Sequence, residues 1–401
     1  MNATLTLGHA LLALAVGVPA AALAASETSR WQDVSVGASL LAVGQNLSAS
    51  PSVAGRNDSQ LNYRADLEIE LPLGEFPGSG TQGILFTHFR AGQGSGVTPS
   101  ATTFTGAVNS TTFALAGTQD EYKALLAQMW YQLSTPVGGQ PQADRFQFIL
   151  GKIDPFVFFD NNAIADDESE GFLNNVFVHN PHLDSGGDIG ADDYGFTPGL
   201  VATYMHSAEP SKQWQVSLGV FGASNGASFQ NSLSDPFTIA QLQYSGSALF
   251  GQEGTYQTYV WNNPQAENAL TAQTESHTGI GVSLSQQLGD TLAVFSRLGS
   301  QIKGTVNFDR SVTAGVQWNG DSWGRNQDRI GFAAGALFAS DEYKQANAGA
   351  KSAETQAELF YTYQVNDNLH VSPHVIHISN PGALTTQSDV TVVGVRTKAA
   401  F

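Results

Sequence analysis

Charged side chains occupy alternate positions in the early part of the chain, which places them on one face of an extended strand. Arg64 and Glu68 follow this spacing within residues 61–71, and we place His88 and Arg90 on the same kind of face further along. Arginine supplies a planar fork of hydrogen-bond donors, and carboxylates accept hydrogen bonds from hydroxyl groups. Such a polar face suits a water-filled lumen and does not by itself indicate bond-breaking chemistry.

Motifs that would indicate catalysis or a metal centre are weak. The chain has no cysteine and no G-x-S-x-G motif, and the G-Q-G-S-G at 92–96 is not followed by a helix. His370, His374 and His377 lie close in sequence, but on a strand His377 points away from the other two. The acidic run 184–195 could bind Ca²⁺, but it lacks EF-hand spacing. Whether calcium stabilises this loop is left undecided by the sequence. We expect no enzyme, no cofactor and no metal.

Composition argues against an ordinary cytoplasmic enzyme and against nucleic-acid binding. Only 13% of the 401 residues are charged, 41% are hydrophobic, and there are 42 glycines. Roughly a quarter of the residues are charged in a typical soluble domain. The formal net charge of −18 leaves no basic surface to neutralise phosphates.

The N-terminus resembles an export signal. An apolar stretch is followed by Ala22-Leu23-Ala24, a small-x-small cleavage pattern, although no lysine or arginine precedes it. We interpret residues 1–24 as a signal peptide and residues 25–401 as a single domain.

Beyond this segment, no run approaches the ~20 consecutive apolar residues that a membrane helix needs. Alternation of apolar and polar residues recurs instead and indicates strands with one oily and one wet face. The clearest example is 61–71, in which every odd position is apolar; the others are 214–220, 280–285, 312–318, 357–363 and 393–401.

Connection lengths favour a membrane barrel over a soluble β-sandwich. The links 287–291 and 365–369 are tight, whereas 92–120 and 224–254 are long and rich in small polar residues. Short turns at one end and long loops at the other are typical of outer-membrane barrels. We therefore predict an all-β, transmembrane antiparallel β-barrel with long extracellular loops, and the length allows about 16 to 18 strands.

The segment after residues 145–154, which we predict to be a strand, suits a pore-constricting loop. Phe156 to Phe159 form an aromatic run, and many acidic residues follow up to Asp193, with no lysine or arginine between Lys152 and Lys212. Such a segment cannot face lipid, so we expect it to enter or cap the pore, with a short helix around 168–178.

The chain ends in Phe401 on a strand-like segment. A last strand that finishes in phenylalanine resembles the signal recognised by the barrel-assembly machinery. The partners expected on this basis are that machinery, outer-membrane lipid and lipopolysaccharide, with the oligomeric state left open.

Several blocks resemble the family of carbohydrate-selective porins typified by OprB. They are G-K-I-D at 151–154, F-F-D-N-N-A-I-A-D-D-E-S and F-L-N-N-V-F after it, G-R-N-Q-D-R-I-G-F-A at 324–333, and the stretch 358–382. The resemblance implies a 16-stranded outer-membrane barrel that passes sugars by diffusion, with aromatic and charged side chains at the constriction. The strongly acidic character of this chain departs from the arginine-rich constriction that such porins often have.

Candidate pore residues follow from position. They are Arg64, Glu68, His88, Arg90 and Trp130 on early strands, and Asp154 and Phe159 near the loop. A charged residue on a lumen face can instead belong to the channel wall, and Trp130 can lie at the membrane interface if its register shifts by one. Two other functions stay open: a general or cation-preferring outer-membrane channel, and a secreted all-β binding or adhesive protein.

Overall fold

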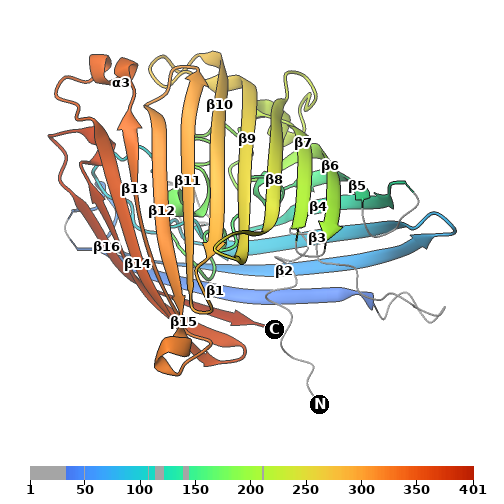
Figure 1. Cartoon of the computed structure of the whole chain (residues 1–401). Coiled ribbons are helices and arrows are strands. Elements are labelled where there is room, and N and C mark those ends of the chain that lie inside the picture. The colour runs from blue at the N-terminus through green and yellow to red at the C-terminus, as the bar shows by residue number, and fades with distance from the viewer. Residues whose placement is uncertain (1–32, 49, 107, 113–121, 139–143, 210–211) are drawn as a thin grey trace.

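Sixteen strands of the described chain close into one antiparallel barrel (Figure 1). The structure, a computed structural model, describes residues 33–48, 50–106, 108–112, 122–138, 144–209 and 212–401. The predicted signal peptide 1–24 lies outside these residues. Each strand pairs with its neighbour in sequence, and β1 pairs with β16 to complete the ring. Closure removes the unpaired strand edges that hydrocarbon does not tolerate.

The strands of the first half are β1 (Ser35–Leu47), β2 (Ser59–Phe76), β3 (Thr81–Gln93), β4 (Lys123–Pro136), β5 (Asp144–Ile153), β6 (Thr197–Glu209), β7 (Lys212–Phe221) and β8 (Phe237–Leu249). Those of the second half are β9 (Gln252–Glu267), β10 (Thr274–Gln287), β11 (Leu292–Lys303), β12 (Phe308–Asn319), β13 (Arg329–Ala339), β14 (Ala353–Asn366), β15 (Leu369–Ser379) and β16 (Val390–Ala400). These bounds confirm the predicted barrel, and the strand number is the one that the family resemblance implies.

Helical segments are short and lie in the connections. They are η2 (Pro155–Val157), α2 (Asn175–Val178), η3 (Ser224–Ser228), η4 (Gly320–Trp323), α3 (Asp341–Ala346) and η5 (Pro381–Ala383). In the described ranges, no helix combines the length and the apolar character needed to cross a membrane. α2 occupies the end of the segment 168–178, where a short helix was expected.

Most connections from an odd-numbered strand to the next are longer than those from an even-numbered strand, although 304–307 is shorter than 320–328. Tight turns at 288–291 and 367–368 confirm two predictions, and the link between β3 and β4 is long as expected. The prediction of one long loop over 224–254 was wrong, because β8 occupies its second half and only 222–236 connects β7 to β8. Polar residues such as Gln241 and Gln243 on the inward face of β8 resemble loop composition.

The connection 154–196 between β5 and β6, hereafter the inner loop, lies inside the barrel (Figure 1, green). Its Phe156, Phe159, Leu183 and Ile189 pack in one apolar cluster with inward residues of β3 to β9. A second cluster joins loop residues, including Phe172 and Phe177, to inward residues of β11 to β14. The inner loop therefore covers much of the inner wall, as expected for a loop that enters the pore.

Inward-facing glycines explain part of the high glycine content. Gly199, Gly279, Gly281, Gly315 and Gly331 each stand opposite an aromatic residue of the paired strand. A Cβ atom on Gly331 would lie 2.2 Å from Cε1 of Phe360, so the phenyl ring occupies the space that a side chain would need. Phe360 in turn packs against Phe172 of the inner loop.

We predict that Gly331→Ala destabilises the barrel by about 1–3 kcal/mol, because the added methyl group overpacks the site and displaces the Phe360 ring. Urea unfolding of the protein in lipid vesicles measures this change. Gly37→Ala is the control, because nothing lies within 4 Å of the corresponding Cβ position. Equal unfolding midpoints for the two variants would contradict the packing argument.

Candidate functional site

A cavity of about 580 Å³ remains between the inner loop and one side of the barrel. Strands β16, β1, β2, β3 and β4 form one wall, and residues of the inner loop form the other. Elsewhere the inner loop packs against inward residues of β5 to β9 and of β11 to β14.

The strand wall carries a compact charged group centred on Asp66. Arg64, Asp66 and Glu68 alternate along β2 and so share its inward face. In the β2–β3 register, Arg90 stands opposite Asp66 and His88 stands opposite Glu68. The Asp66 carboxylate accepts hydrogen bonds from Arg64 Nε at 2.8 Å and Arg90 Nε at 2.7 Å, and lies 2.8 Å from His88 Nε2.

The loop wall is acidic and contacts this group directly. Glu168 Oε1 accepts a hydrogen bond from Arg64 Nη1 at 2.5 Å, which links β2 to the inner loop. Glu170 pairs with Lys398 of β16 at 2.8 Å and with Arg329 of β13 at 2.7 Å. Ion pairs to arginine or lysine residues of β2, β13 and β16 thus hold the loop segment 168–170.

The protonation of the loop residues depends on burial and on their partners. Burial raises the pKa of Asp166 to about 8, in spite of nearby His179 and Arg297. Burial would also raise the pKa of Glu168, but Arg64 and Arg90 outweigh it and lower the pKa to about 2. Burial opposes protonation of His179, yet its hydrogen bond to Asp184 and the surrounding carboxylates raise its pKa to about 9. At neutral pH Glu168 is ionised, Asp166 is largely protonated, and His179 is cationic.

Aromatic rings form the third component of the cavity lining. Trp130 stacks on Phe86 with ring centroids 4.7 Å apart, and Phe158 meets Trp130 edge-on at 6.0 Å. On the loop side, Phe156 stacks on His179 at 3.8 Å. Trp130 is therefore an inward residue and does not lie at the membrane interface.

Six of the seven candidate residues line this cavity, and one lies apart. Arg64, Glu68, His88, Arg90, Trp130 and Asp154 all contribute to its surface. Phe159 is 1% exposed and packs edge-on against Phe221, on the wall side of the inner loop. Asp154 begins η2, where its carboxylate accepts the backbone N–H of Phe156 at 3.0 Å.

Several lining residues were not among the candidates. They are Asp66, Gln128, Glu168, Glu170, His179 and Lys398. Lys398 lies two residues after Arg396 on the last strand, so the period of two could have predicted that the Lys398 side chain points inward. The loop residues carry no such period, and only the local density of acidic residues indicated their region.

The acidic run 184–195 makes contacts within the protein. Asp184 Oδ2 lies 2.7 Å from His179 Nδ1, and Asp188 accepts a hydrogen bond from Trp261 Nε1 at 2.7 Å. Across the ranges that the structure describes, there is no group of three or more His, Cys, Asp or Glu residues that could hold a metal ion. His377 points away from His370 and His374, as expected: it is exposed, and the other two are buried.

Comparison with known proteins agrees with this geometry. Residues 54–401 match the family described as carbohydrate-selective porin, OprB family. The high-pH structure of Pseudomonas putida OprB is 16% identical, with a TM-score of 0.71 over 93% of this chain and 98% of that one. A mutant of the Rhodopseudomonas blastica porin is 14% identical, with a TM-score of 0.53 over 92% of this chain and 100% of that one.

A curated relative matches a smaller part of the chain. The uncharacterised protein alr4550 of Nostoc sp. is 30% identical over 162 residues, which are 39% of this chain. The aligned part spans 27% of that protein's length.

The family match extends over most of the chain, and the barrel agrees with that of the solved porins. The chain belongs to the OprB family of carbohydrate-selective porins, which are outer-membrane channel proteins and not enzymes.

Proposed function

We propose that small neutral carbohydrates diffuse through this barrel along the wall formed by β16 and β1 to β4, and bind weakly in the cavity beside the inner loop. The observation that carries the proposal is the juxtaposition of arginine, carboxylate and aromatic side chains in one cavity. A sugar that enters a narrow pore loses hydration. Donors and acceptors on the wall replace the lost hydrogen bonds, and aromatic rings contact the apolar faces of the sugar.

The two arginines of the wall have different parts in this proposal. Arg64 is 5% exposed and donates to both Asp66 and Glu168. Among the residues that the structure describes, Arg90 donates only through Nε, to Asp66, so its terminal amino groups are free to meet a solute. We therefore assign sugar contact to Arg90 and positioning to Arg64.

The remaining candidates divide in the same way. The Glu68 carboxylate lines the cavity and accepts no hydrogen bond from any other described residue, so it is an acceptor for sugar hydroxyl groups. His88 is 2% exposed and supports Asp66, and Asp154 begins the turn that presents Phe156 and Phe158. Trp130 supplies a ring face, whereas Phe159 supports the loop from behind.

The proposal includes export and assembly. The signal peptide 1–24 would direct the chain out of the cytoplasm and be cleaved, which leaves 25–401 to form the barrel. The C-terminal Phe401 is 73% exposed beside β1, to which its backbone N–H donates at Ala38 O. It is therefore accessible to assembly machinery, and lipid and lipopolysaccharide would surround the closed barrel.

A cation-preferring channel is the second candidate, and the charge of the cavity favours it. Ten aspartate and glutamate residues line the cavity, against two arginines and one lysine. An acidic constriction attracts cations and repels anions. A secreted, membrane-free protein has no comparable support, because the exposed face of the barrel is rich in leucine, valine and phenylalanine.

One prediction from this proposal concerns Arg90. We expect Arg90→Ala to weaken sugar binding by about tenfold to a hundredfold, because a charge-assisted hydrogen bond contributes about 1.5–3 kcal/mol. Liposome swelling with glucose, a disaccharide, an amino acid of similar size and simple salts measures the preference. Arg310→Ala, at an exposed arginine of β12, is the matched control. Uptake by the unaltered protein that is ordered only by size and positive charge would sink sugar selectivity and leave the cation-preferring channel.

Another prediction from this proposal concerns pH. Asp166, with a pKa of about 8, gains a negative charge as pH rises from 7, and His179, with a pKa of about 9, then loses its positive charge. Both steps make the cavity more negative, so the K⁺/Cl⁻ permeability ratio should rise between pH 7 and 10. Reversal potentials across planar bilayers measure this ratio. Asp166→Asn should remove the step near pH 8, and an unchanged profile in that variant would refute the assignment.

A further inference from the structure

Two buried arginines that do not line the cavity hold the inner loop from two different strands of the barrel wall. Arg297 comes from β11 and Arg396 from β16, and each is 1% exposed. Both guanidinium groups donate to backbone carbonyl oxygens of the inner loop. Neither residue belongs to the cavity surface, so neither is placed to touch a passing solute.

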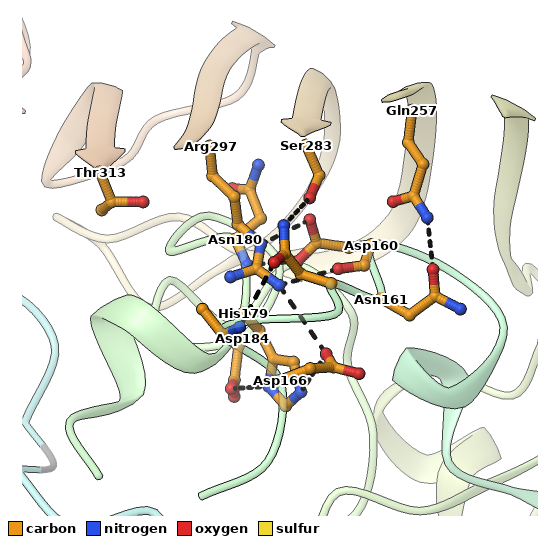
Figure 2. Close-up of polar contacts among 12 residues, drawn as sticks. Asp160, Asn161, Asp166, His179, Asn180, Asp184, Gln257, Ser283, Arg297 and Thr313 are labelled. Carbon is orange, nitrogen blue, oxygen red and sulfur yellow. Dashed lines mark hydrogen bonds and ion pairs between the residues drawn. The ribbon is translucent and has the colours of Figure 1, made fainter. Parts of the chain in front are cut away.

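Arg297 fixes the beginning and the middle of the inner loop together (Figure 2). Its Nε donates to Asp160 Oδ1 and its Nη2 to Asp160 O, both at 2.9 Å, and its Nη1 donates to Phe177 O at 2.9 Å. Asp160 has a positive φ of 58° and is 0% exposed. Its carboxylate also accepts the backbone N–H of Asn180 at 2.6 Å and the hydroxyl of Tyr259 at 2.7 Å.

This anchor lies directly behind one acidic side of the cavity. Arg297 Nη2 lies 3.8 Å from Asp166 Oδ1, and the same oxygen lies 3.8 Å from His179 Nε2. Asp166 and His179 both line the cavity. Figure 2 shows Arg297 reaching from its strand toward Asp160 and Asp166, between Ser283 of β10 and Thr313 of β12.

Arg396 fixes the part of the inner loop that faces β2. Its Nη1 donates to Glu168 O at 2.8 Å and Gly171 O at 2.9 Å, and its Nη2 donates to Glu170 O at 2.7 Å. The side chains of Glu168 and Glu170 lie on the cavity surface, where they pair with Arg64 and Lys398. The backbone that carries these two carboxylates is thus held from behind by one guanidinium.

We infer that Arg297 and Arg396 are positioning residues, which set the solute specificity of the pore by fixing the acidic side of the constriction without touching the solute. A guanidinium presents several donors in one plane, whereas a lysine ammonium is a point charge that cannot bond three separated oxygen atoms of the loop in this way. Replacement by lysine therefore preserves charge but releases the loop backbone. The specificity part of this inference rests on the proposed passage of sugars.

The experiment compares Arg297→Lys, Arg396→Lys and the exposed control Arg310→Lys in planar bilayers. The measured quantities are single-channel conductance and the sugar concentration that halves it. We expect both buried variants to show higher conductance with larger current fluctuations. The half-blocking concentration should rise about tenfold, because the released loop no longer holds its cavity-lining carboxylates where they can accept a hydrogen bond from the solute. The control should match the unaltered protein. Folding is checked by heat-modifiable migration in gels, which a positioning role leaves unchanged.

If a lysine variant does not fold, Asp160→Asn provides a second test. This substitution removes the charged partner of Arg297 while it preserves the shape of the side chain, and it should also raise the conductance. Wild-type conductance and half-blocking concentration in all folded buried variants would overturn the inference. Absence of sugar block in the unaltered protein would instead refute the proposed function. The effect on ion conductance and its fluctuations would then still decide whether the two arginines position the loop.

Discussion

An irregular segment inside a barrel must find partners for its backbone polar groups, and this requirement shapes the interior of this protein. The inner loop has no neighbouring strand edge to pair with, because the barrel is closed. Side chains of the barrel wall supply the missing hydrogen-bond partners. Arg297 and Arg396 donate to carbonyl oxygens of the loop, and Glu358 accepts hydrogen bonds from the N–H groups of Leu173 and Asn174 at 2.7 and 2.9 Å. The course of the loop therefore depends on a few long polar side chains.

The charge distribution follows from the same requirement. The chain has 17 basic residues and 35 acidic ones, yet β2, β11, β13 and β16 each direct an arginine at the inner loop. These guanidinium groups are largely occupied by loop carbonyl and carboxylate oxygens. The acidic residues outnumber them, so the surface left for a solute carries the excess negative charge. The negative charge of the cavity therefore comes from the carboxylates that exceed the number of guanidinium groups anchoring the loop.

The degree to which the sequence predicts this arrangement differs between the two sides of the barrel. On β2 the inward face borders the cavity, so Arg64 and Glu68 stay polar, the alternation is strict, and both strand and direction could be predicted. On β11 and β14 the inward face is covered by the inner loop, so Phe295 and Phe360 point inward, and alternation no longer separates the two faces. Phe159 illustrates the same limit of sequence analysis. Its position in the chain placed it near the pore, but the sequence did not show that it lies on the side of the loop that packs against the wall.

The anchoring also explains how arginine can serve two opposed requirements of a selective channel, namely weak binding and specificity. Diffusion requires weak binding, since a site that retains its solute blocks the channel. Specificity requires a constriction whose shape is already fixed, so that ordering the site does not consume the small binding energy available. Arginines with several nitrogens engaged, such as Arg297 and Arg396, supply the fixed shape. In the function proposed above, Arg90 keeps its terminal donors unengaged and supplies a single weak contact with the solute. On that proposal, the number of engaged nitrogens on each guanidinium separates the residues that build the constriction from those that meet the solute.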